Sequence, residues 1–271
     1  MWEQLDETVK FLRSKTDFEP RVGIILGTGL SGLADEIEAS FSISYADIPH
    51  FPVSTVQSHK GKLIFGTLHG QPVVAMAGRF HYYEGYSMKE LTFPVRVLKH
   101  LGIERLMVSN AAGGVNPDYR AGDLVFIEDH INMMPDNPLR GKNDDRLGPR
   151  FPDMLHAYDK VLNQKALELA HGLGIRAHKG VYVGLPGPNL ETPAEYHFMH
   201  VIGADVVGMS TVPEVLVARH MDLPVFVFSV VTNQCYPLDQ IKETTVDDVI
   251  AMANRTEAAI KPLIKELIAI V

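Results

Sequence analysis

The stretch IERLMVSNAAGGVNP, residues 103–117, joins an apolar run to a run of small and polar residues. The run that ends at Val108 is typical of a buried strand, and Asn110 to Gly114 offer no large side chain to cover its end. A strand of this kind leaves backbone N–H groups open where α/β proteins bind their ligands. The stretch therefore predicts a binding loop, although an ordinary strand-exit turn explains the same residues when they are taken alone.

Short apolar runs alternate with longer segments of helical periodicity along the rest of the chain. This alternation predicts an α/β fold, with helices packed around a mostly parallel sheet. The expected strands are 22–26, 62–66, 72–76, 105–109, 124–127, 180–184 and 225–229, and the expected helices are 88–100, 158–173, 214–221 and 246–270.

The length of the chain favours one domain. Its 271 residues, 46% of them hydrophobic, can bury one large core. We therefore expect a single domain over residues 1–271. Residues 128–157 are polar, proline-rich and weakly periodic, and we expect them to form a long excursion within that domain or to pack against a neighbouring subunit.

The charge and the cysteine content exclude several classes of partner and site. The formal net charge is -8 and the basic residues are scattered, so neither nucleic acid nor an anionic membrane is an expected partner. Cys235 is the single cysteine, which excludes an internal disulfide and a thiolate metal site and fits a cytoplasmic setting. The acidic N-terminus does not have the pattern of a signal peptide, and no run of 18 apolar residues occurs.

The first expected strand leads directly into GTGLSG, residues 27–32, which matches the dinucleotide pattern G-x-G-x-x-G. That interpretation requires a helix, a second strand and an acidic residue about 20 positions on, and Asp47 is the nearby candidate. The glycines and the Thr28 hydroxyl suit a phosphate cradle better, because backbone N–H groups and a hydroxyl can all donate to an oxyanion.

The segment GRFHYYEGY, residues 78–86, follows the expected strand 72–76. Arg79 offers a fork of donors that matches an oxyanion, and His81 points the same way from extended chain. The alternative is a surface pair between Arg79 and Glu84 beside a packed histidine. His59, in QSHKGKL, has the same two interpretations.

The segment GPNLETPAE, residues 187–195, follows the expected strand 180–184 and opens a helix. Thr192 and Glu195 have the spacing of a capping box. Glu191 lies outside that arrangement, so its carboxylate is available to accept N–H groups of a heterocyclic base, although a solvated loop glutamate is the common alternative.

Two further segments, VGMST (207–211) and SVVTN (229–233), place small and polar residues at the ends of apolar runs. Met209 suits either the core or the apolar face of a sugar. Ser210 offers a hydroxyl, and Asn233 offers both a donor and an acceptor.

Metal and nucleophile patterns are weak. His197 and His200 are the closest histidine pair, but no acidic or HExxH pattern accompanies them, so no metal is expected. G-x-S-x-G is absent and Cys235 has no activating neighbours in the sequence, which favours a small packed thiol.

Taken together, these segments resemble the trimeric purine nucleoside phosphorylases. The matching segments are GTGLSGL, SHKGKL, GRFHYYEGY, SNAAGGVNP, NPLRGKNDDRLGPRFPDM, GPNLETPAE, VVGMSTVPE and the TN at 232–233, in the family's order over about residues 20–260. The resemblance implies a single α/β domain with a twisted mixed central β-sheet flanked by helices, and a homotrimer. It implies phosphate-dependent cleavage of purine nucleosides, with inorganic phosphate as co-substrate and no cofactor.

The resemblance also assigns roles to residues. Asn233, His81 and Glu191 are the expected catalytic residues. Phosphate is expected to contact Thr28, Arg79, His81, Asn110, Ala111 and Ser210. The purine is expected to contact Glu191, Asn233, Leu190, Val207 and Gly208. The ribose is expected to contact Tyr83, Met209, Phe151 from a neighbouring subunit, and Val246.

Three positions depart from the family's pattern. Val246 stands where many members have the histidine that meets the ribose 5′-hydroxyl, Gln234 where many have lysine, and Leu190 where an aromatic residue is common. A valine cannot replace that hydrogen bond, so we expect tolerance of 5′-deoxy nucleosides.

The alternatives are a methylthioadenosine phosphorylase and a catalytically silent nucleoside-binding protein. Methylthioadenosine phosphorylases usually have aspartate at the position of Asn233, because a carboxylate accepts from a 6-amino group whereas an amide can donate to a 6-oxo group. Asn233 therefore favours inosine, guanosine and their 2′-deoxy forms as substrates.

Overall fold

The computed structural model describes residues 1–28, 31–55 and 60–270, in which nine strands form one sheet. The strand order is β2-β3-β4-β1-β5-β8-β7-β6-β9, and β9 also pairs with β5, which closes the second part of the sheet into a ring. The strands are β1 Val22–Leu26, β2 Glu38–Ser44, β3 Lys62–Leu68, β4 Gln71–Ala77, β5 Arg105–Gly114, β6 Leu124–Asn132, β7 Ala177–Gly184, β8 Val206–Gly208 and β9 Val225–Gln234.

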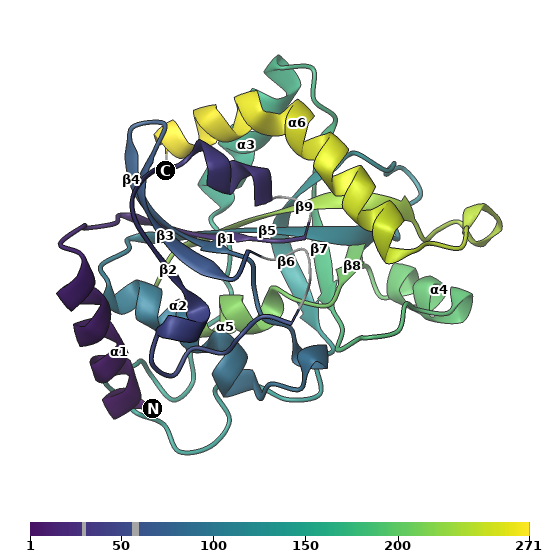
Figure 1. Cartoon of the computed structure of the whole chain (residues 1–271). Helices are drawn as coiled ribbons and strands as arrows, with labels where there is room; N and C mark the ends of the chain where they lie inside the picture. The colour runs from purple at the N-terminus through teal and green to yellow at the C-terminus, as the bar shows by residue number, and fades with distance from the viewer. Residues whose placement is uncertain (29–30, 56–59, 271) are drawn as a thin grey trace.

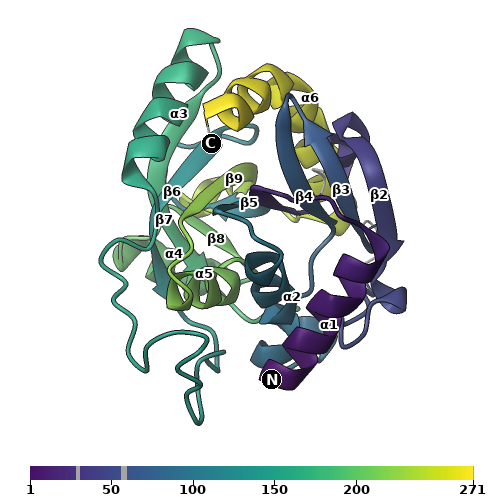
Figure 2. The ribbon, with the colours of Figure 1, turned by 90° about the vertical axis from the view of Figure 1, so that its left-hand side faces the viewer.

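Helices cover both faces of this sheet (Figure 1), with α3 and α6 on one face and α1, α2 and α5 on the other (Figure 2). The α-helices are α1 Trp2–Lys15, α2 Met88–His100, α3 Lys160–Gly172, α4 Pro193–Val201, α5 Val212–His220 and α6 Val246–Ile270. Short 3₁₀ helices occur at η1 Ser31–Glu36, η2 Tyr45–Asp47, η3 Tyr82–Glu84 and η4 Leu238–Gln240. The two larger of the three core clusters among the described residues follow the same division, because one contains buried residues of α1, α2 and α5 and the other those of α3 and α6.

The α/β class and the mixed sheet that the resemblance implies are confirmed. The expectation of a mostly parallel sheet holds only narrowly, because five strand pairings in the described sheet are parallel and four are antiparallel. The antiparallel pairings join β2 to β3, β3 to β4, β5 to β8 and β6 to β9. Parallel pairing joins β1 to β4 and β5, β5 to β9, and β7 to both β6 and β8.

The predicted loop after Val108 is instead a continuation of β5, which runs to Gly114 beside β9. Small residues are needed here because the partner strand comes close. A Cβ atom on Gly113 would lie 2.6 Å from Cys235 Sγ, and one on Gly114 would lie 3.0 Å from Val231 Cγ1. Small residues therefore mark a tightly packed pair of strands in this chain rather than a strand exit.

The dinucleotide interpretation of residues 27–32 is also wrong. In the described segment 31–55, β1 is followed by η1, β2 and η2, and β2 pairs antiparallel with β3. A dinucleotide site needs an α-helix and a second parallel strand at this place. Asp47, the expected partner of a ribose, lies exposed in η2.

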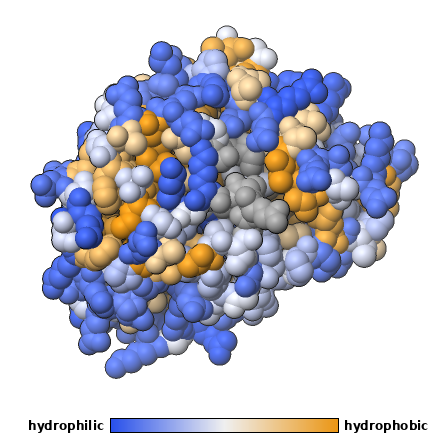
Figure 3. Space-filling view, viewed as in Figure 1, coloured by the Kyte–Doolittle hydropathy of each residue, from blue (hydrophilic) through white to orange (hydrophobic). Residues whose placement is uncertain are grey.

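Residues 133–159 contain no helix or strand and extend from the body of the molecule as the teal loop of Figure 2. This agrees with the predicted excursion, although its first residues, 128–132, belong to β6. The face seen in Figure 3 is mostly hydrophilic, with smaller hydrophobic groups between polar residues. Within the described ranges, none of the helices has the length and apolar character needed to span a bilayer.

Candidate active site

A cavity of about 150 Å³ lies at the ends of β5, β8 and β9, beside the first turns of α4 and α6. It brings together every predicted site residue except Phe151 and Val246. Those that line it are Thr28, Arg79, His81, Tyr83, Asn110, Ala111, Leu190, Glu191, Val207, Gly208, Met209, Ser210 and Asn233. These residues are far apart in the sequence, so the fold alone brings them to one site.

The pairing of β5 explains where the cavity opens. On one edge β5 pairs with β9 along its whole second half. On its other edge it pairs with β1 as far as Val108 and with β8 only from Gly113. Among the described residues, Ser109 to Ala112 therefore have no strand partner on that edge. Asn110 and Ala111, which line the cavity, lie in this gap between two partner strands.

The end of β1 approaches the same gap. The Gly27 N–H donates to Ser109 Oγ at 3.2 Å, and a Cβ atom on Gly27 would collide with the carbonyl oxygen of Ser109. This close approach places Thr28 at the cavity. Gly29 and Leu30, in the same glycine-rich segment, and His59 lie outside the described residues.

Arg79 is buried, so it does not form the surface pair with Glu84 that was the alternative interpretation of this segment. Its guanidinium makes a two-pronged contact with Glu214 of α5, with Nε to Oε1 at 3.2 Å and Nη2 to Oε2 at 2.9 Å. Its Nη1 donates to the Ser109 carbonyl oxygen and to Ser210 Oγ, both at 3.0 Å. The buried carboxylate therefore fixes the guanidinium beside the serine hydroxyl.

Sequence reasoning did not identify Glu214 as a partner of Arg79. The signal was a single acidic residue in the apolar segment TVPEVLVA, residues 211–218. A carboxylate buried in such a segment requires a charged partner.

His81 pairs with Glu84 instead, with Nδ1 3.1 Å from Oε1. Glu84 also accepts the backbone N–H of His81 and both the N–H and the hydroxyl of Thr55. Burial raises the pKa of Glu84, but these hydrogen bonds outweigh burial and bring the pKa to about 2. Burial lowers the pKa of His81, and the contact with Glu84 opposes that change only in part. The imidazole ring stacks on Tyr83, with the ring centroids 4.7 Å apart.

Asn110, Ser210 and Thr211 form a hydrogen-bonded group beneath Arg79. Asn110 Nδ2 donates to Thr211 Oγ1 at 2.9 Å, and the hydroxyls of Ser210 and Thr211 are 3.0 Å apart. Thr211 holds a φ of 68°, a strained value for a β-branched residue, where α5 begins. Asn110 Oδ1 is buried without a partner among the described residues, as expected of a polar group that awaits a ligand.

Glu191 and Asn233 also line the cavity. Burial raises the pKa of Glu191, and a hydrogen bond with Tyr196 opposes the increase. Asn233 lies within β9 rather than in a loop, with Nδ2 3.2 Å from Cys235 Sγ. Gly208 must lack a side chain, because a Cβ atom there would collide with the hydroxyl of Tyr182.

Leu190, Val207 and Gly208 line the cavity with Glu191 and Asn233, and Tyr83 and Met209 line it too. Val246 is 72% exposed and does not line the cavity. Val249, three residues further along α6, lines it instead. The resemblance to the family pointed to position 246 and could not show which residue in this turn of α6 faces the cavity.

Phe151 lies in the 133–159 loop, is 86% exposed and does not reach this cavity in its own chain. Residues that line the cavity without having been predicted are Ala112, Gly113, Tyr196, Thr232 and Val249. Most of them precede or follow a predicted residue by one to three positions.

Several other residues have a capping or packing role in the structure. Thr192 and Glu195 form the predicted capping box of α4. His197 and His200 both stack on Tyr236, with ring centroids 6.0 and 4.0 Å apart respectively. Within the described segments, no three His, Cys, Asp or Glu side chains are arranged to hold a metal ion. Cys235 is a buried thiol whose pKa burial raises to about 12, so it is a packed residue rather than a reactive nucleophile.

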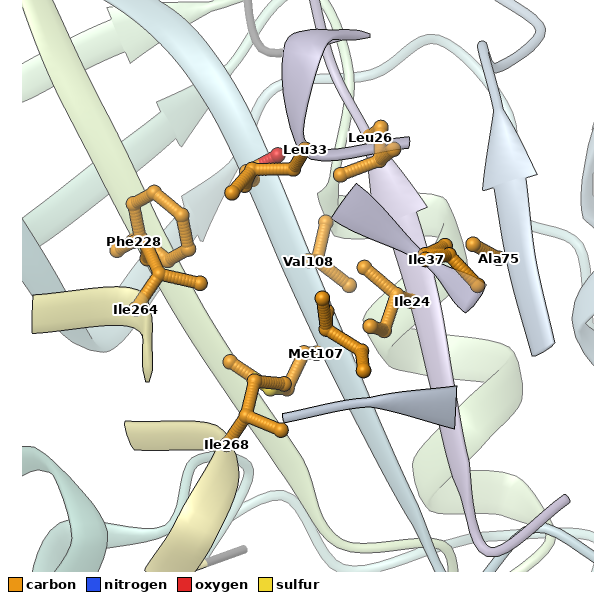
Figure 4. A pocket seen from close by; sticks show the side chains of 12 residues that line it. Ile24, Leu26, Leu33, Ile37, Ala75, Met107, Val108, Phe228, Ile264 and Ile268 are labelled. Atoms are coloured by element: carbon orange, nitrogen blue, oxygen red, sulfur yellow. The ribbon is translucent and has the colours of Figure 1, made fainter. Parts of the chain in front are cut away.

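A second cavity, of about 10 Å³, lies between α6 and the sheet (Figure 4). Its lining is almost entirely apolar and includes Ile24, Met107, Phe228, Ile264 and Ile268. Ser109 also lines it, but its hydroxyl is paired with the Ile25 carbonyl oxygen. This cavity is a small packing void in the core.

Known proteins match the chain over nearly its whole length. The profile of the phosphorylase superfamily matches residues 21–269. Purine nucleoside phosphorylase 1 of Geobacillus stearothermophilus is 51% identical over 265 residues, which cover 97% of this chain and 96% of that protein. Purine nucleoside phosphorylase 1 of Bacillus subtilis is 49% identical over 270 residues, 99% of each chain. The mouse purine nucleoside phosphorylase is 50% identical over 238 residues, 86% of this chain and 82% of that one.

Solved structures give the same result. Isoform 2 of the purine nucleoside phosphorylase from Schistosoma mansoni, in complex with cytosine and ribose-1-phosphate, superposes with a TM-score of 0.93 at 39% identity, covering 98% of this chain and 96% of that one. A Schistosoma mansoni purine nucleoside phosphorylase in complex with adenosine superposes with a TM-score of 0.92 at 41% identity and the same coverage.

Proposed function

The chain belongs to the phosphorylase superfamily, and from that membership we propose that it is a purine nucleoside phosphorylase with inosine and guanosine as preferred nucleosides. It cleaves the N-glycosidic bond with inorganic phosphate and releases the purine and ribose 1-phosphate. The observation that carries the proposal is one cavity lined both by Arg79, His81 and Ser210, whose donors suit an anion, and by Glu191 and Asn233, whose polar groups suit a purine. In this proposal residues 1–271 form a single phosphorylase domain.

At one end of the cavity, Arg79, His81 and Ser210 hold phosphate together with Thr28 and Asn110. The guanidinium supplies positive charge, and its buried partner Glu214 fixes it within 3.0 Å of Ser210 Oγ. The unpaired edge of β5 adds the backbone N–H of Ala111. Charge and converging donors suit an oxyanion.

At the other end, Glu191 and Asn233 hold the purine between Leu190, Val207 and Gly208. An ionised Glu191 accepts N–H groups of the six-membered ring, and Asn233 bonds the base near N7 and the 6-substituent. An amide can donate to a 6-oxo group, which supports inosine and guanosine over adenosine.

The mechanism follows from the charges that bond cleavage creates. As the glycosidic bond breaks, positive charge develops on the ribose and negative charge on the purine. Phosphate faces the cationic sugar carbon, and Asn233 stabilises the departing base by hydrogen bonding. A well-placed donor in a site without water is worth roughly 3 to 4 kcal/mol, or about 10²- to 10³-fold in rate. Phosphate is the co-substrate, and no cofactor takes part in the proposed reaction.

The sugar lies between Tyr83 and Met209, with Val249 of α6 at its 5′ side. Val249 replaces Val246 in this role, and because it is equally apolar the expectation of 5′-deoxy tolerance remains. This tolerance is the one feature that favours a methylthioadenosine phosphorylase, while Asn233 opposes it.

We further propose a homotrimer that acts in the cytoplasm. Phe151, exposed in its own chain, reaches the ribose site of a neighbouring subunit. The free thiol of Cys235 fits a reducing compartment.

The test is to incubate inosine, guanosine, xanthosine, adenosine, methylthioadenosine and 5′-deoxyinosine with the protein, with and without phosphate. We expect hypoxanthine release from inosine only with phosphate, faster than adenine release from adenosine, and similar kinetics for inosine and 5′-deoxyinosine. Binding of inosine without phosphate-dependent release would identify a silent nucleoside-binding protein. Preferred cleavage of methylthioadenosine would overturn the 6-oxopurine preference.

A further inference from the structure

The amide of Asn233 is held from both sides by side chains of its own strand end. Thr232 Oγ1 lies 3.0 Å from Asn233 Oδ1, the nearer of its two acceptors, the other being the Ala112 carbonyl oxygen at 3.3 Å. Asn233 Nδ2 donates to Cys235 Sγ at 3.2 Å. A carboxamide has two N–H donors and two acceptor lone pairs. One donor and one acceptor are therefore engaged by the protein, which leaves one of each for a ligand in the cavity.

The environment of Cys235 makes its sulfur an acceptor toward that amide. The thiol is 1% exposed, and burial keeps it protonated by raising its pKa to about 12. Its sulfur also lies 4.0 Å from the Asn233 carbonyl oxygen, which can accept the S–H while a sulfur lone pair faces Nδ2. A flipped amide would place Oδ1 against the sulfur, and the S–H would then have to leave the Asn233 carbonyl oxygen in order to donate to Oδ1.

The position of the sulfur is itself fixed by packing. A Cβ atom on Gly113 would lie 2.6 Å from Cys235 Sγ and 3.7 Å from Asn233 Oδ1, so only glycine leaves room for the thiol. Tyr196, which is buried and lines the same cavity, contacts both Cys235 and Glu191. The thiol thus lies between Gly113, Tyr196 and the amide.

We propose that Cys235 is a positioning residue that fixes the orientation of the Asn233 amide and thereby sets the preference of the site for a 6-oxopurine over a 6-aminopurine. The inference rests on the proposed function, because it requires Asn233 to contact the base. A 6-oxo group accepts a hydrogen bond and a 6-amino group donates one, so recognising each requires opposite ends of the amide. An amide that cannot flip discriminates between them, whereas an amide free to flip accepts either.

The experiment compares C235A with C235S, which keeps an acceptor oxygen in place of sulfur. The readout is the ratio of kcat/KM for inosine to kcat/KM for adenosine at saturating phosphate. We expect C235A to lower this ratio about threefold to tenfold, the effect of one lost hydrogen bond, and C235S to keep it within about twofold of the wild type. KM for phosphate should be unchanged in both variants, because Cys235 does not line the cavity near Arg79.

C235V serves as a second variant that fills the volume of the thiol without an acceptor, in case C235A does not fold. An unchanged ratio in a folded C235A or C235V overturns the inference, as does an equal fall in C235S. Titration calorimetry with hypoxanthine and adenine gives the same comparison without turnover. A wild-type protein that cleaves neither nucleoside would refute the proposed function, while the ratio of the two base affinities would still test the role of Cys235.

Discussion

At the scale of single residues, the site depends on carboxylates that do not themselves face the ligand. Glu214 neutralises and orients Arg79, and Glu84 holds His81. Neither pairing was predicted, because local spacing offered only Glu84, five positions away, as an alternative partner for Arg79. The partner of a buried charge is chosen by the fold, here across 135 positions of sequence, so local spacing could not identify it.

Removal of Glu214 should destabilise the protein more than an ordinary substitution. Arg79 and Glu214 are 1% and 4% exposed, so E214A leaves a buried guanidinium without its counter-charge. We expect a loss of about 3 to 5 kcal/mol in the free energy of unfolding, measured by denaturant titration. Saturating phosphate should raise the free energy of unfolding of E214A and recover part of the loss. The increase should be larger in E214A than in the wild type, because the anion then neutralises the Arg79 guanidinium in place of Glu214. A loss below 1 kcal/mol would show that the pair contributes little.

His81 should make anion binding depend on pH. Burial lowers its pKa, so the ring is neutral at and above pH 7 and gains its positive charge as the pH falls. A charged imidazolium attracts the anion, so competitive inhibition by sulfate should strengthen as the pH falls below 6.5, by about tenfold once the ring is fully charged. Sulfate is the probe because its own charge does not change over this range. The H81Q variant should show a flat profile; a wild-type profile as flat as that of H81Q would exclude this role.

At the scale of elements, the sequence predicted whether a segment is a helix or a strand better than it predicted where that segment ends. The bounds of β1, α2 and α6 agree with the predicted ranges, because their apolar periodicity runs to both ends. Strands β5 and β9 run five residues beyond the predicted ends, since glycine, asparagine and threonine normally mark turns. Tertiary pairing overrides that preference here, and β8, only three residues long, gives no periodic signal at all.

Helix α6 contributes to the site at two points, only one of which lies at the cavity. Val249 lines the cavity. Glu257, two turns further along the helix, accepts the N–H of Leu33 in η1 at a distance of 2.7 Å. A Cβ atom on Gly32 would come within 2.7 Å of the same carboxylate. The helix therefore anchors η1 at Gly32 and Leu33.

Loss of this anchor should weaken phosphate binding and lower stability together. Glu257 is 6% exposed, so E257A leaves the Leu33 N–H buried without a partner, at a cost of about 1 to 3 kcal/mol in unfolding free energy. We expect KM for phosphate to rise severalfold while KM for inosine changes little. E257Q keeps an acceptor oxygen and should resemble the wild type in both measurements. If E257A raised KM for inosine and left that for phosphate unchanged, the contact would serve the other end of the cavity.

At the scale of the whole molecule, the fold closes a ring of strands whose ends converge on one cavity. Thirteen predicted site residues from six segments of the chain meet there. The sequence could predict these residues because the segments occur in the order of a known family. It could not predict the contacts among them, such as the bond of Asn233 to Cys235, because these depend on distances that only packing sets.

The proposed role of Phe151 depends on the assembly of subunits. Its side chain is 86% exposed in the single chain, and the loop that carries it has no helix or strand to restrain it. In the proposed trimer, light scattering should give a mass of about 90 kDa, three times the 30.0 kDa chain. F151A should raise KM for inosine without lowering the melting temperature of the protein. An active protein of 30.0 kDa would rule out a site completed by a neighbouring subunit.

The central claim is that one cavity holds phosphate and a 6-oxopurine side by side. A crystal structure with hypoxanthine and sulfate tests it most directly. We predict sulfate in contact with Ser210 and the N–H of Ala111, and hypoxanthine between Glu191 and Asn233, separated only by the space of a ribose. Sulfate and hypoxanthine bound at unconnected places on the molecule would contradict it.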